Sequence, residues 1–65
     1  MGVKYLWNLH KSRNIKLTSI REFIISGYSN CWTVKAVISS YDEAEMYRSR
    51  NRDECVQWID AHNEA

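Results

Sequence analysis

The stretch RNRDECVQWIDAH, residues 50–62, predicts an amphipathic helix that must lie against an apolar surface. Asn51 suits the first cap position, and Glu54 three residues later completes a capping-box pattern, so we expect a helix over residues 51–63. At 100° per residue, one side of this helix gathers Cys55, Val56, Trp58, Ile59 and His62. The opposite side carries Asp53, Glu54, Gln57, Asp60 and Ala61.

The best candidate for that apolar surface is CWTVKAVIS, residues 31–39, which has the alternation of a half-buried strand. Trp32, Val34, Ala36 and Ile38 share one face, and Thr33, Lys35 and Ser39 share the other. We therefore predict an α+β fold, a small two-layer domain in which one C-terminal helix covers an antiparallel sheet of three or four strands. Trp58 is expected to pack near Trp32 and Val34, and the second face of the sheet should stay uncovered.

Three further segments are candidates for the remaining strands. Residues 3–9 alternate apolar and polar side chains and predict a strand, after which Lys11 to Asn14 reads as a polar loop. Residues 44–50 follow the turn SSYDE and predict a strand paired with 31–39. The buried face of that strand is open, because Ala44 and Met46 compete with Tyr47 for it.

The segment before residue 31 carries two conflicting signals. Its β-branched residues favour a strand over residues 20–26. Ser19 and Glu22 form a possible capping box, and Gly27 is a possible helix stop, so a short helix is the alternative.

Size and composition describe one domain over residues 1–65. Hydrophobic residues make up 45% of the chain and there is no proline or repeat, which argues against disorder and against a linker. A chain of this size is expected to have a stability of roughly 3–10 kcal/mol. Neither a signal peptide nor a membrane span is recognisable, so we expect a cytoplasmic protein whose Cys31 and Cys55 are reduced, small and buried.

The sequence offers little for catalysis or for cofactor binding. His10, Cys31, Cys55 and His62 are enough ligands for zinc, but they lack the close pairwise spacing of structural zinc sites. Cys55 and His62 lie about 10 Å apart along the expected helix, too far for a thiol and its base. With two glycines there is no phosphate-binding loop, so we expect a protein that is not an enzyme and has no metal, cofactor or small-molecule substrate.

Binding to another protein is the function that the composition favours most. Eight aromatic residues exceed what so small a core readily buries, so some should serve as interface anchors. The candidates are Tyr5, Trp7, Tyr28, Tyr41 and Tyr47. The expected role is that of an inhibitor or adaptor, with self-association as one form of it and no membrane partner. By analogy, free-standing domains of this size suit the accessory proteins of phages and mobile elements.

Nucleic-acid binding is the alternative, because the charges are unevenly distributed. Residues 1–41 carry six Lys or Arg against one Glu, whereas residues 42–65 carry three Arg against seven Asp or Glu. A basic face would neutralise phosphates of DNA or RNA. Its candidate residues are Lys11, Arg13, Lys16, Lys35, Arg48 and Arg50.

The run from Cys31 to His62 resembles the AP2-like (arm-type) N-terminal DNA-binding domains of tyrosine integrases. WTVKAV and YRSRNRDECVQWID carry the resemblance, since a basic strand leads into a helix with an acidic start. It covers about half of the chain. The resemblance implies a three-stranded sheet facing the DNA major groove, with Lys35, Arg48 and Arg50 at the contact.

Overall fold

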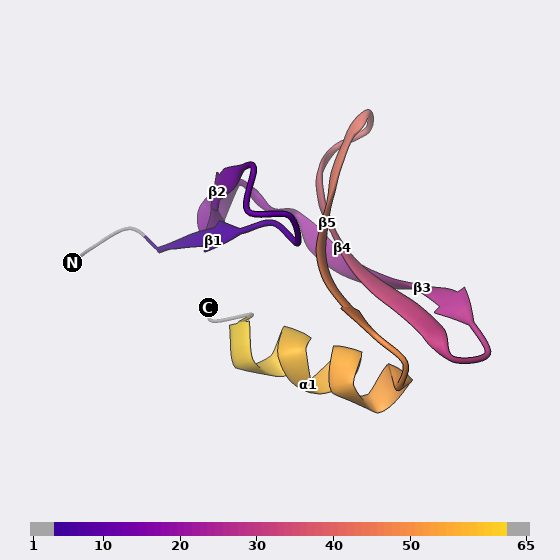
Figure 1. Cartoon of the computed structure of the whole chain (residues 1–65). Helices are drawn as coiled ribbons and strands as arrows, with labels where there is room; N and C mark the ends of the chain where they lie inside the picture. Colours follow the sequence, from indigo (N-terminus) through magenta and orange to yellow (C-terminus); the bar gives the residue numbers. More distant parts are fainter. Residues whose placement is uncertain (1–3, 63–65) are drawn as a thin grey trace.

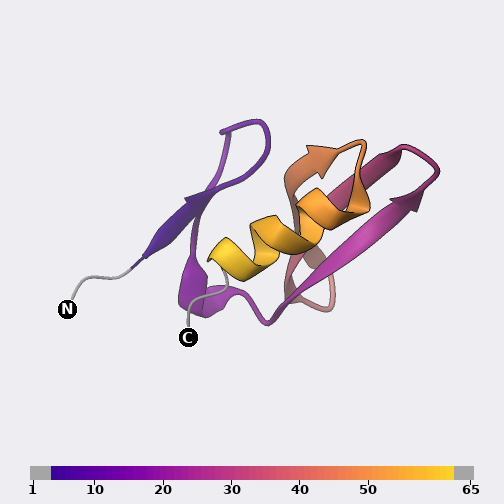
Figure 2. The ribbon, with the colours of Figure 1, turned by 90° about the horizontal axis from the view of Figure 1, so that it is seen from below.

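The computed structural model describes residues 4–62 and confirms an α+β fold made of two antiparallel sheets and one C-terminal helix (Figure 1). The elements follow in the order β1 (Tyr5–Trp7), β2 (Asn14–Lys16), the 3-10 turn η1 (Leu17–Ser19), β3 (Glu22–Tyr28), β4 (Cys31–Ser39), β5 (Asp42–Ser49) and α1 (Arg52–His62). Seen from below, α1 runs across one face of the β3–β4–β5 sheet, and the β1–β2 hairpin lies beside the end of the helix (Figure 2). Within residues 4–62, no helix is long and apolar enough to cross a membrane.

Strand β4 is the centre of the larger sheet, as its alternating pattern predicts. It pairs antiparallel with β3 on one side and with β5 on the other. Val34 and Ala36 are fully buried on the helix side. Ile25 and Phe23 are their partners on β3, so the inner face of the sheet continues across that strand.

A β-bulge at Met46 decides which side chains of β5 are buried. Val34 pairs with Tyr47 while Lys35 pairs with Glu45, so Met46 is an extra residue without a partner. A bulge of this kind breaks the strict alternation of side chains, because two residues of one strand oppose one of the other. Ala44 and Met46 are therefore buried while Tyr47 also lies on the helix side. The sequence left open whether Ala44 and Met46 or Tyr47 would face the helix, and the bulge allows all three to do so.

The second bulge lies at Ile38 in β4, where the partners jump from Val37–Glu43 to Ser39–Asp42. Bulges bend a strand and increase its twist. In Figure 1 the two strands of the β4–β5 hairpin accordingly turn away from the plane of the sheet towards their common tip.

The N-terminal strand is shorter than predicted and does not join the main sheet. β1 spans residues 5–7 of the predicted 3–9, residue 3 lying outside the described residues, and it pairs with β2, which the sequence did not predict. The polar stretch after β1 is a tight turn, because the Asn8 side chain accepts backbone N–H bonds from Ser12 (2.8 Å) and Arg13 (3.1 Å). This turn brings residues 14–16 back alongside β1.

The segment before residue 31, for which the sequence allowed a strand or a short helix, forms a strand. Only a single 3-10 turn forms at residues 17–19, and β3 begins at residue 22 and ends at residue 28, two residues later than predicted at each end. The β-branched residues of this segment, Ile24 and Ile25 in β3 itself, outweigh the capping-box signal. Gly27 adopts φ 140° next to the turn into β4, a conformation that favours glycine.

The C-terminal helix starts as predicted, but its cap differs in detail. The Asn51 side chain accepts the backbone N–H of Asp53 at 2.9 Å, as an N-cap residue should. Glu54 does not reach back to the Asn51 backbone; its carboxylate accepts a hydrogen bond from the Ser49 hydroxyl instead. The Ser49 oxygen in turn accepts the backbone N–H of Asn51 at 3.1 Å. The Ser49 hydroxyl thus connects the Glu54 carboxylate to the Asn51 backbone N–H, which the two residues of a capping box would join directly. Residue 63, the last of the predicted helix, lies outside the described residues.

The helix packs with the face that the sequence predicts. Cys55 is fully buried, and Val56, Trp58, Ile59 and His62 are half-buried. Trp58 belongs to the same hydrophobic cluster as Trp32 and Val34, as predicted. Its aromatic partners, however, come from the neighbouring strands: Phe23 meets it edge-on at 5.7 Å, and Tyr47 stacks on it at 5.8 Å between ring centroids.

Candidate binding surfaces

We call the face of the β3–β4–β5 sheet that points away from α1 the outer face; among residues 4–62, no other helix or strand lies over it. The strand register places Lys35 beside Glu45, Thr33 beside Arg48 and Val37 beside Glu43 on this face. It also carries Ile24, which is the β3 partner of Lys35. Ile24 and Val37 are half-buried apolar side chains that a strict inward–outward pattern would not place here. Only the pairing of β3 with β4 reveals that they are neighbours.

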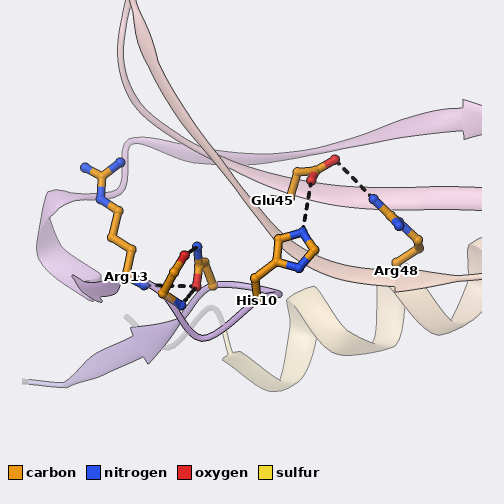
Figure 3. A network of polar contacts seen from close by, with 6 residues as sticks. His10, Arg13, Glu45 and Arg48 are labelled. Atoms are coloured by element: carbon orange, nitrogen blue, oxygen red, sulfur yellow. Dashed lines mark hydrogen bonds and ion pairs between the residues drawn. The ribbon is translucent and has the colours of Figure 1, made fainter.

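The cations of the outer face have carboxylates close by. Arg48 lies 3.4 Å from Glu45, and His10 reaches the other oxygen of the same carboxylate at 4.0 Å (Figure 3). Lys35 stands opposite Glu45 in the strand register. Glu22 and Glu43 add two more carboxylates to this face, so its charge is mixed rather than basic.

Two shallow hollows lie at the two ends of the outer face. One, of about 400 Å³, is lined by residues that include Tyr28, Cys31, Thr33 and Lys35. The other, of about 430 Å³, is lined by Arg21, Glu22, Val37, Ser39 and Ser40. Both are open to solvent and bordered mostly by polar side chains, so they differ from the enclosed apolar pockets that hold small molecules.

The β1–β2 hairpin and the residues at its ends (residues 4–17), here called the ribbon, form a second candidate surface. Leu6 and Ile15 face the core, whereas Tyr5 and Trp7 point outward with 52% and 54% of their surface exposed. Their partners on β2 are Lys16 for Tyr5 and Asn14 for Trp7. Two aromatic rings, an amide and an ammonium group therefore share one side of the ribbon.

The other predicted anchors lie apart from this pair. Tyr28 is 81% exposed at the end of β3, and Tyr41 is 100% exposed at the tip of the β4–β5 hairpin. Tyr47 is half-buried and stacks on Trp58, so it contributes to the internal packing. The five aromatic residues thus divide among the ribbon, two turns and the core.

The six predicted basic residues do not gather on one surface either. Arg13 forms a two-pronged contact with Asp42, at 2.9 Å and 2.8 Å, which ties the ribbon to the start of β5. Hydrogen bonding from the Arg13 guanidinium lowers the pKa of Asp42, and that of Arg13 is raised in turn. Lys35 and Arg48 lie on the outer face, whereas Lys11, Lys16 and Arg50 are exposed elsewhere.

The cysteines and histidines do not come together. Cys31 is exposed on the outer face, which corrects the prediction that it is buried, because the pairing of β4 with β3 turns it away from the helix. Cys55 is buried as predicted, and its burial raises the pKa of the thiol. His62 stacks on Trp58 and contacts the Trp58 carbonyl oxygen at 2.8 Å. Among residues 4–62, no three metal-ligating side chains gather.

No family model, curated protein or solved structure matches this chain.

Proposed function

We propose that this chain is a non-enzymatic, intracellular protein that binds another protein through the outer face of its β3–β4–β5 sheet. The observation that carries the proposal is the pairing of exposed charges with apolar side chains on that face. Ile24 and Val37 are only half-buried there and are not covered by the helix; Ile24 lies beside Lys35 on β3, and Val37 lies two residues after Lys35 on β4. An apolar centre with a polar rim is the usual composition of a protein interface.

The charges of the outer face support a protein partner rather than a polyanion. Glu45 neutralises Arg48 at 3.4 Å and stands opposite Lys35, so little positive potential is left for phosphates. A patch of both signs can instead match a patch of both signs on another protein and fix its register. Tyr28, which is 81% exposed beside one hollow, is suited to anchor the edge of such an interface.

A chain that works by occupying a surface suits an inhibitor or adaptor. It needs a rigid face, and a sheet held from behind by a helix supplies one. It needs no catalytic group.

Site-specific photo-crosslinking in cells tests the proposal. A photo-reactive residue at Val37, in the outer face, is expected to capture one protein in a stoichiometric product. The same residue at Gln57, which is exposed on the far side of α1, is the matched control and should capture none. Val37→Lys with an unchanged circular dichroism spectrum should abolish the complex. Equal labelling from both positions, or a complex that survives Val37→Lys, contradicts the proposal.

DNA or RNA binding by the same face is the second candidate. It is favoured by the placement of Lys35 and Arg48 on one uncovered face, where the resemblance of residues 31–62 to AP2-like domains implies that DNA lies. A gel shift with duplex DNA at low salt is expected to be weakened by Arg48→Ala, with Arg52→Ala on the helix as control. If no shift occurs at low salt, this candidate is excluded.

A further inference from the structure

We propose that the ribbon binds single-stranded nucleic acid, with Tyr5 and Trp7 stacking on bases and lysines contacting the backbone. This surface is separate from the outer face and goes beyond the function proposed above. Four observations carry the inference: the spacing of the rings, their exposure, the charge around them and the rigidity of their support.

The two rings are positioned side by side by the strand itself. Tyr5 and Trp7 are two residues apart in β1, so their Cα atoms lie about 6.5 Å apart on the same side. Leu6 between them is buried in the core and holds the strand in place. Exposed aromatic rings at successive outward positions of a strand form a platform on which neighbouring bases stack.

The charges that the ribbon itself carries are all positive. Residues 4–21 contain five Lys or Arg and no carboxylate. Lys16 stands directly opposite Tyr5, and Lys4 and Lys11 flank the two ends of the ribbon. Arg13 forms an ion pair with Asp42, whereas Lys4, Lys11 and Lys16 form no ion pair with any of residues 4–62. Their ammonium groups can therefore neutralise phosphates.

The ribbon is held rigidly, which lowers the entropy lost on binding. Its turn is closed by the Asn8 side chain, and the backbone N–H of Leu9 donates to the Glu45 carbonyl at 2.8 Å. At its other end, the backbone N–H of Leu17 donates to the Lys4 carbonyl at 2.9 Å. Rings on such a support keep their orientation before a ligand arrives.

The chemistry of this surface distinguishes between three anionic partners. A DNA duplex hides the faces of its bases, so it would leave Tyr5 and Trp7 unused. An acidic protein would satisfy the lysines but offers few flat rings. An unpaired strand supplies both flat bases and regularly spaced phosphates, and so uses every feature of the ribbon.

Fluorescence anisotropy of a labelled twelve-nucleotide oligo-dT and of oligo-U, at low salt, tests the inference with the full chain. Both strands are expected to bind, and Trp7→Ala is expected to weaken binding about tenfold, since stacking on one ring is lost. Trp7→Phe should restore most of the affinity. Tyr41→Ala, which removes a fully exposed ring from the turn between β4 and β5, is the control and should bind like the natural chain.

Salt dependence tests the lysines separately. Three ammonium–phosphate contacts predict that log K falls with log salt with a slope of about −2, and Lys16→Gln should make the slope shallower by about 0.7. Failure to bind either oligonucleotide at low salt overturns the inference. So does equal binding by Trp7→Ala and Tyr41→Ala, or duplex DNA that competes as well as single strands. Poly-glutamate that displaces the strand as effectively as unlabelled oligo-dT would show an acidic-protein site instead.

Discussion

Tyr47 and Trp58 stack across the boundary between sheet and helix, with ring centroids 5.8 Å apart and planes 15° from parallel. Phe23 meets the same indole edge-on, and His62 stacks on it at 4.2 Å. Trp58 thereby links β3, β5 and the last turn of α1. Because this molecule has few fully buried side chains, its stability depends strongly on a residue that links several elements, as Trp58 does.

Replacing Trp58 by Ala is expected to lower the free energy of unfolding by about 2–4 kcal/mol. The value is below that of a fully buried Trp because this side chain is only half-buried. In a domain with a stability of roughly 3–10 kcal/mol, a change of this size removes a large part of the stability. Urea denaturation measures it. Trp58→Phe should lose less, and Trp7→Ala, on the exposed ribbon face, should lose under about 0.5 kcal/mol; equal losses at both tryptophans would contradict the packing.

Asn51→Ala should cost about 1 kcal/mol, because the Asp53 backbone N–H loses its side-chain acceptor. Asn51→Asp keeps an acceptor and should be nearly neutral. The midpoint of urea denaturation is the measurement, with the exposed Gln57→Ala as a helix-surface control. Ser49→Ala should also destabilise, since it interrupts the relay between Glu54 and Asn51. A silent Ser49→Ala would show that the relay has no energetic role.

The two thiols should react at very different rates with Ellman's reagent. Cys31 is exposed and should react at once, whereas Cys55 is fully buried and should react only when the chain opens. Burial raises the pKa of Cys55, which further suppresses its thiolate. In urea both should react quickly. The pKa of the Cys55 thiol is higher in the folded state than in the unfolded state. The stability of the fold should therefore fall as pH rises above the unfolded pKa of about 8.5. Two equally fast thiols in the native protein would contradict the burial of Cys55.

The Arg13–Asp42 contact should make stability depend on acid pH. Arg13 lowers the pKa of Asp42 in the folded state, so the contribution is present above the unfolded pKa of about 4 and is lost as pH falls through the folded value. Asp42→Asn should lower the melting temperature by at most about 5 °C at pH 7, since the pair is exposed. The difference from the natural chain should shrink below pH 4 and in high salt. A difference that persists at pH 2.5 would point to another cause.

Local sequence patterns predicted the central strand, the final helix and the face with which that helix packs. Val34 and Ala36 alternate with polar neighbours, and Cys55 and Trp58 recur at helical spacing, so burial can be inferred from each segment alone. The capping residue Asn51 is equally local. These features need no knowledge of distant residues, because the periodicity of one element specifies its buried side.

Other features depended on contacts between distant residues. The pairing of β1 with β2 requires the Asn8 turn, whose hydrogen bonds are not visible in an apolar–polar pattern. The sides occupied by Met46 and Tyr47 depend on a bulge that exists only between two paired strands.

The candidate surfaces show the same division. Exposed aromatic and basic residues were recognised from composition, but their grouping was not. Tyr5 lies opposite Lys16, Ile24 lies opposite Lys35, and Arg13 forms an ion pair with Asp42. Sequence alone determined which segments are amphipathic, since that is a property of neighbouring residues; tertiary structure decided which exposed groups act together, because strand register and turn geometry set the distances between residues far apart in the chain.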